Sequence, residues 1–130
     1  MRFSSQLVTS LHEGRGLKIR AGRRHRFIGI WVVVVESRVF VRSWSLKTRS
    51  WYRTFLKNPQ GDIQVGKRTI PVVAVQTRST RLRNAVDRAY LEKYATPGAL
   101  KYAKDLGSPK SRATTLELRP AAPWAAADNR

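Results

Sequence analysis

A long apolar run followed by an alternating one constrains the fold of this chain more than any other feature. The run 27–35 is rich in β-branched residues and almost unbroken, which is typical of a strand covered on both faces. The next strand, 39–43, alternates, so Arg42 should share a face with Phe40. The connection 36–38 lacks the Asn-Gly or Asp-Gly pair common in tight turns, but its length suits a hairpin. A β-hairpin is therefore the first element that we expect.

Capping residues and periodicity predict the other elements. Helices are expected at 4–13, from Trp51 to the Asn58-Pro59 pair, at 80–94, and from Pro97 with Thr96 as the cap. Strands are expected at 17–20, 62–65, 68–76 and 113–119, with a turn at Gly66-Lys67. Pro71 argues for an edge strand or a bulge. These elements predict a single α+β domain with a mostly antiparallel sheet over residues 1–120, followed by a flexible tail over 121–130.

Charge and composition exclude several classes of function. The 130 residues include 26 Lys and Arg but 8 Asp and Glu, which gives a net charge of +18. Without cysteine there is no disulfide, thiolate zinc site or cysteine nucleophile, and two histidines with few acids leave little for a metal centre or a hydrolytic triad. For this reason we expect no bound metal. We also expect a cytoplasmic protein, because no targeting signal or membrane-length apolar run is present. The balance points to binding of an anion.

One segment has the chemistry of an anion site. Lys47, Thr48, Arg49 and Ser50 precede a helix that begins at Trp51, where free backbone N–H groups and the helix dipole favour negative charge. Arg42 and Ser43, at the end of the preceding strand, could face the same spot, and Arg24 in the basic run 23–26 could contribute from further away. The alternative is a solvated basic loop whose serine only caps the helix.

Aromatic residues near this segment allow two interpretations. Trp44 or Trp51 could flank a planar ring, because aromatic and guanidinium faces stack on bases and flavins. Core packing is the other interpretation, and Tyr90, Tyr94 and Tyr102 fit it, since they lie at helical spacing. Catalytic sequence motifs are absent, so no catalytic residue is identified and any chemistry would belong to a cofactor.

Several segments carry a family resemblance. They are Ile30–Val35, Val39–Ser43, Trp51-Tyr52, Val86–Tyr94 with its Ala-Tyr-x-x-Lys-Tyr element, and Arg112–Leu116. Over roughly residues 5–120 the chain resembles an uncharacterised bacterial family, the domain of unknown function 2255. It departs from that pattern at Glu36-Ser37, where Asp-Gly is expected, and at Lys47-Thr48, where small residues are usual.

The pattern is in turn similar to the split β-barrels of pyridoxamine-phosphate-oxidase-like proteins and deazaflavin-dependent reductases. In those proteins a strand ending in Arg-Ser, a basic loop, a short helix and Asn-Pro follow in this order. The resemblance implies an FMN-binding split-barrel fold with flanking helices, a homodimer, and an FMN or deazaflavin cofactor that supports oxidoreductase activity. The residues expected to bind the cofactor are Arg24, Arg42, Ser43, Lys47, Thr48, Arg49, Ser50 and Trp51.

Two other functions stay open at this point. The charge of +18 also suits a small nucleic-acid-binding protein, because lysine and arginine contacts to phosphates release counterions. An interaction domain that has lost its cofactor pocket is the third possibility.

Overall fold

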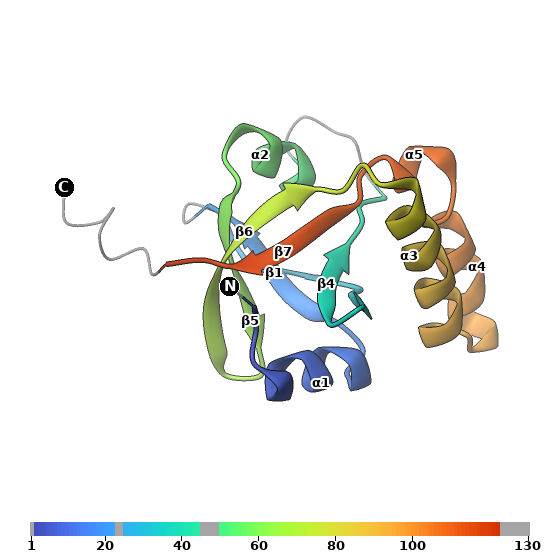
Figure 1. The fold of residues 1–130 in the computed structure, drawn as a ribbon, viewed down its shortest axis with the longest axis horizontal. Helices are drawn as coiled ribbons and strands as arrows, with labels where there is room; N and C mark the ends of the chain where they lie inside the picture. The colour runs from blue at the N-terminus through green and yellow to red at the C-terminus, as the bar shows by residue number, and fades with distance from the viewer. Residues whose placement is uncertain (1, 23–24, 45–49, 123–130) are drawn as a thin grey trace.

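The described part of the chain forms a curled, seven-stranded antiparallel sheet flanked by five helices (Figure 1). The structure is a computed structural model that describes residues 2–22, 25–44 and 50–122. The strand order across the sheet is β2-β1-β5-β6-β7-β4-β3, and every neighbouring pair is antiparallel. This α+β half-barrel is the split-barrel architecture that the sequence predicts.

The strands are β1 (Leu17–Ala21), β2 (Ile28–Ile30), β3 (Val33–Val35), β4 (Arg38–Val41), β5 (Gln60–Val65), β6 (Arg68–Gln76) and β7 (Leu116–Pro120). The helices are α1 (Ser5–Glu13), α2 (Trp51–Lys57), α3 (Thr80–Lys93), α4 (Pro97–Asp105) and α5 (Pro109–Arg112). Residues 123–130, most of the expected tail, lie outside the described part of the chain.

The concave face of the sheet holds the first hydrophobic core. Leu17, Ile19 and Ala21 of β1 point into it, and α1 and α2 close it with Leu11 and Phe55. Ser4 caps α1 and Ser50 caps α2, each through a side-chain oxygen that accepts a backbone N–H. The two helices thus begin where their capping residues predict.

A second core joins the sheet to a layer of helices. Along β4 the side chains alternate, so Val39 and Val41 belong to the first core and Phe40 to the second. Phe40 and Val33 pack there against Val86 and Tyr90 of α3. In Figure 1, α3, α4 and α5 stand together beside the β4 end of the sheet. The sheet is therefore covered on both faces at this end, as the continuous apolar run predicts.

The predicted strand 27–35 is divided in the structure. Trp31 and Val32 lie between β2 and β3, which occupy opposite ends of the strand order. Because extended chain covers at most roughly 3.5 Å per residue, the end of β2 must lie close to the start of β3. The Trp31–Val32 link, here called the seam, therefore brings two edges of the curled sheet together at one corner.

The two predicted hairpin turns are confirmed, with different geometries. Glu36 and Ser37 connect β3 to β4, and both have positive φ angles, 55° and 61°. Gly66 connects β5 to β6 with Lys67 and has a φ of 62°. The first turn therefore places two residues with side chains in the left-handed region that glycine and asparagine prefer.

The expectation that Pro71 marks an edge strand or a bulge is wrong. β6 lies inside the sheet, between β5 and β7. The register with β7 begins one residue later, at Val72, and the Ala121 N–H just beyond β7 still donates to the Pro71 carbonyl at 3.1 Å. Pro71 therefore costs the sheet one N–H donor at the margin of the β6–β7 pairing.

Candidate functional site

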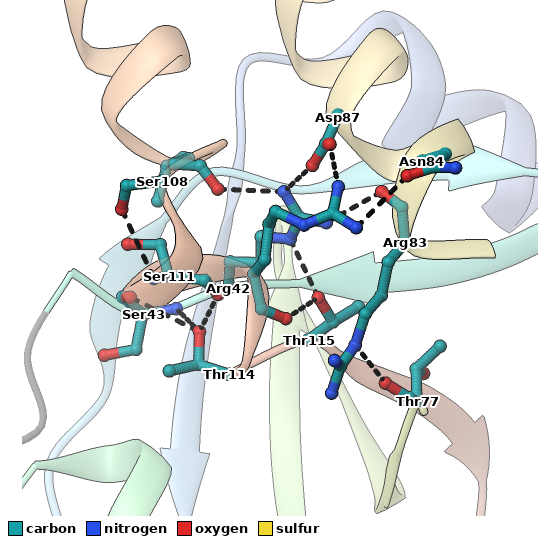
Figure 2. Close-up of polar contacts among 12 residues, drawn as sticks. Arg42, Ser43, Thr77, Arg83, Asn84, Asp87, Ser108, Ser111, Thr114 and Thr115 are labelled. Atoms are coloured by element: carbon teal, nitrogen blue, oxygen red, sulfur yellow. Dashed lines mark hydrogen bonds and ion pairs between the residues drawn. The ribbon is translucent and has the colours of Figure 1, made fainter. Parts of the chain in front are cut away.

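Arg42, a predicted phosphate ligand, is buried among groups of the protein itself. Its side chain is 0 % exposed and donates four hydrogen bonds (Figure 2). Nε donates to the Thr115 hydroxyl at 2.8 Å, and the terminal nitrogens donate to Asp87 and to the carbonyls of Leu106 and Arg83. A side chain with no exposed surface offers no donor to a ligand. The prediction that Arg42 binds a phosphate therefore disagrees with its placement.

Asp87 neutralises this buried cation and a second one. One carboxylate oxygen lies 2.5 Å from the Arg42 guanidinium, and the other pairs with Arg112. Burial lowers the pKa of Arg42, and the hydrogen bond and charge of Asp87 partly restore it. The cluster connects the end of β4 to α3, to the end of α4 and to the start of β7. Its role is therefore to stabilise the fold.

The other described residues of the predicted site lie in two places. Ser43 is buried beside Thr114, whose hydroxyl accepts the Ser43 backbone N–H at 2.8 Å. Ser50 caps α2, and the half-buried Trp51 packs against the first core and edge-on to Phe55. The structure does not bring the Arg42 guanidinium to the N-terminus of α2. Arg24, Lys47, Thr48 and Arg49 lie outside the described residues.

The Ala-Tyr-x-x-Lys-Tyr element, residues 89–94 and here called the α3 clasp, forms hydrogen bonds with the backbone of the seam. The Val32 N–H donates to the Tyr94 hydroxyl at 3.1 Å, and that hydroxyl donates to the Arg15 carbonyl at 2.5 Å. Lys93 Nζ donates to the Val32 carbonyl at 2.8 Å, and the Tyr90 hydroxyl donates to that of Trp31. Side chains of α3 thus satisfy backbone groups that no neighbouring strand reaches. Sequence spacing predicts that the tyrosines pack, but not that their hydroxyls meet this backbone.

An open cleft lies on the convex face of the sheet, beside the seam. This outer cleft has a volume of about 700 Å³, within the range of small-molecule sites. Gly29, Lys18 and Gln64 form its floor, because they are cross-strand partners on β2, β1 and β5 and so share a face. A Cβ atom at Gly29 would meet nothing within 4 Å, so the glycine leaves the floor open there.

Tryptophan rings form one wall of the outer cleft. Trp31 and Trp44 meet edge to face with ring centroids 5.6 Å apart, and Trp44 is 43 % exposed. Trp31 also stacks on Tyr94, with centroids 3.9 Å apart and planes within 2°. Because Tyr94 is fixed by the seam, Trp31 is held in a defined orientation. The two tryptophans thus present aromatic surface to the outer cleft.

Positive charge lines the same cleft. Arg15 and Lys18 are exposed and line it, and neither forms an ion pair among the residues that the structure describes. By contrast, six other arginines pair with the carboxylates of Glu36, Asp62, Asp87 and Glu117. The cleft therefore combines aromatic surface with cations that are available to an anion, an arrangement that sequence spacing did not indicate.

Residues 2–22, 25–44 and 50–122 contain neither a candidate metal site nor a candidate membrane-spanning helix. No cluster of three or more His, Cys, Asp or Glu residues in these segments could hold a metal ion. No helix in the same segments is both long enough and apolar enough to cross a bilayer.

Comparisons with known proteins give a family and a fold. The model of a family described as an uncharacterized protein conserved in bacteria, DUF2255, matches residues 11–118. No curated protein gives a significant match. Among solved structures, the conserved hypothetical protein Rv2991 from Mycobacterium tuberculosis is similar, with a TM-score of 0.59 and 12 % identity over 94 % of this chain and 81 % of that chain. Such low identity supports the fold alone. Because the family match covers the strands of the barrel and the α3 clasp, this chain belongs to the uncharacterised bacterial family DUF2255.

Proposed function

We propose that this protein binds a planar, phosphate-bearing cofactor of the flavin or deazaflavin class in the outer cleft and acts as an oxidoreductase. The observation that carries the proposal is the meeting of two tryptophan rings with cations that form no ion pair among the described residues, over the open floor at Gly29. The split-barrel fold supports it by analogy.

The residues of the cleft fit such a group. Trp44, which is exposed, and Trp31, which is oriented by Tyr94, would flank the ring system. Arg15 and Lys18 would bind the phosphate, and a guanidinium can grip a phosphate through two hydrogen bonds at once. Lys47 and Arg49 follow Trp44 within a few residues of sequence, and their part in binding stays a prediction. When bound, the cofactor would supply the hydride chemistry, and the protein would set its orientation and exclude water.

Titration of the purified protein with FMN and with a deazaflavin phosphate tests the proposal. We expect quenching of tryptophan fluorescence and a rise in melting temperature with at least one of the two. Trp44→Ala and Gly29→Val should each raise the Kd about tenfold or more, which corresponds to about 1.4 kcal/mol. Trp44 is exposed and Gly29 has open space above it, so both variants should fold.

Lys57→Gln serves as the matched control, because this exposed lysine lies at the end of α2 and does not line the cleft. Its Kd should equal that of the wild type. No binding of either cofactor at millimolar concentration, or equal binding by Gly29→Val and the wild type, would overturn the proposal.

The proposal includes a homodimer, as the resemblance to split-barrel reductases implies. Sedimentation equilibrium with and without cofactor measures the assembly directly. A monomer at micromolar concentration under both conditions would remove this part of the proposal and leave the cleft itself in place.

Nucleic-acid binding is a second candidate, and the charge carries it. Lys101, Lys104 and Lys110 are exposed on α4 and α5, and none forms an ion pair within the described chain. Binding of duplex and single-stranded DNA measured across a salt series tests this function, since phosphate contacts make affinity fall steeply with salt. Affinity that vanishes at moderate salt, or that is equal for heparin, would reject a specific nucleic-acid function.

A further inference from the structure

We propose that a second pocket, which shares Arg15 and Trp31 with the outer cleft, binds a small aromatic carboxylate with Lys93 as its counter-charge. This lateral pocket has a volume of about 550 Å³. It lies between the end of α1, the seam, the end of α3 and the start of α4, and its lining includes Arg15, Trp31, Lys93 and Tyr102. The inference does not depend on cofactor binding in the outer cleft.

Lys93 supplies the charge that the proposed ligand would meet. Its Nζ donates to the Leu11 carbonyl at 2.6 Å and to the Val32 carbonyl at 2.8 Å. An ammonium group has three N–H donors, so one is left after these two bonds. Because Lys93 lines the pocket, we infer that the remaining donor serves a ligand there.

No carboxylate neutralises this amine within the described chain. Glu13 and His12, at the end of α1, line the same pocket, but neither forms an ion pair with Lys93. The other titratable groups around the pocket are Arg15, Tyr94 and Tyr102. Burial lowers the pKa of Lys93 to about 8, and an anion placed beside it would reverse that shift.

Aromatic surface specifies the kind of anion. Trp31 lines the pocket beside Tyr94, on which it stacks, and Tyr102 is 45 % exposed at the same pocket. The ring of Trp44 meets both Trp31 and Tyr102 edge to face, which links the walls of the two sites. A planar acid can place its ring against these side chains and its carboxylate between Lys93 and the forked donors of Arg15. Inorganic anions would use the charge but leave the aromatic surface unused.

Calorimetric titration with benzoate, its neutral isostere benzamide and inorganic phosphate, in the absence of flavin, tests the inference. Benzoate should bind at least about tenfold more tightly than the other two, and its affinity should fall above pH 8, where Lys93 loses its proton. Lys93→Gln should abolish the preference for benzoate over benzamide, and Lys93→Arg should keep part of it. The exposed Lys104 of α4, which does not line the pocket, provides the matched control, so Lys104→Gln should bind benzoate as the wild type does.

Two further variants separate the possible reasons for failure. Tyr102→Ala removes an exposed side chain from the wall of the pocket and should weaken benzoate binding. This variant tests the pocket if Lys93→Gln does not fold. Gly29→Val, which fills the outer cleft, should leave benzoate binding unchanged, so loss of the cofactor proposal does not remove this one. Equal affinity for benzoate and benzamide, or no measurable binding of benzoate, would overturn the lateral pocket as a carboxylate site.

Discussion

At the scale of single residues, Arg42 shows which part of a site a sequence can predict. Alternation along β4 correctly places Arg42 on the same face as Phe40. What covers that face depends on groups distant in the chain, at Arg83, Asp87, Leu106 and Thr115. No local pattern reports such contacts, so the interpretation of Arg42 as a surface ligand could not be corrected from sequence. The aromatic wall at Trp31 has the same origin, since it needs Tyr94 from α3.

Removal of the Arg42 guanidinium should destabilise the fold strongly. Arg42→Met leaves the carbonyls of Arg83 and Leu106 buried without a donor, and the cost expected for breaking such a buried ionic network is about 3 to 5 kcal/mol. Arg42→Lys should rescue little of this, because an ammonium cannot replace the forked donors. Urea denaturation measures the effect.

Arg81 provides the matched control for this experiment. It pairs with Glu36 on the surface, and exposed ion pairs contribute about 0 to 1 kcal/mol. If Arg42→Met and Arg81→Met lower the free energy of unfolding by similar amounts, the buried network does not stabilise the protein.

At the scale of elements, local signals predict helices and turns well and strand breaks poorly. Ser50 before α2, Pro97 at the start of α4 and Gly66 between β5 and β6 all act where the sequence predicts, because caps and turns depend on a few adjacent residues. The division of residues 27–35 into β2 and β3 carries no such signal. It follows from the closure of the sheet at the seam, which is a tertiary effect.

The β3–β4 turn can be improved by one substitution. Ser37 has a φ of 61°, a conformation that costs a residue with a side chain about 1 kcal/mol relative to glycine. Ser37→Gly should therefore raise the free energy of unfolding by about 0.5 to 1 kcal/mol, measured by urea denaturation. Ser37→Ala keeps a Cβ and should give no gain. A destabilised Ser37→Gly protein would show that the serine side chain contributes more than the strain removes.

Contact between α2 and β5 depends on the absence of a side chain at position 61. A Cβ atom there would lie 2.4 Å from the Arg20 carbonyl oxygen and 2.7 Å from the Phe55 ring. Gly61→Ala should lower the free energy of unfolding by about 1 to 3 kcal/mol, the usual cost of overpacking. Gly29→Ala is the control, since it adds the same methyl group where nothing lies within 4 Å. Equal thermal stability of the two variants would contradict this account.

At the scale of the whole molecule, a few acidic residues form ion pairs with a larger number of arginines. Glu117 of β7 is buried and pairs with Arg38 of β4 and with Arg119. Burial alone would raise the pKa of Glu117, but hydrogen bonds from Arg38 and Arg119 lower it below its usual value. The split-barrel class itself was predictable from the family pattern, whereas this pairing of charges depends on strand order.

Because the pKa of Glu117 is lowered in the folded protein, the free energy of unfolding should decrease at acidic pH. A carboxylate with a pKa lower in the folded than in the unfolded state stabilises the fold above its usual value of 4.5, and this contribution is lost as pH falls through the folded value. Denaturation between pH 2 and pH 7 should show a shallower acid slope for Glu117→Gln than for the wild type. Glu92→Gln, at an exposed position of α3, should keep the wild-type slope. Parallel slopes for all three proteins would disprove the assignment.

The clasp at the seam also bears on strand exchange between molecules. The strands β2 and β3 end the sheet order, so each presents an edge that no further strand covers in the described structure. Strand edges of this kind are templates for pairing between molecules. The side chains of Lys93 and Tyr94 pin the backbone between the two edges to α3, and without that anchor the segment up to Trp31 could swing out and exchange with its counterpart in a second molecule. We therefore expect that loss of the α3 clasp favours strand exchange between molecules.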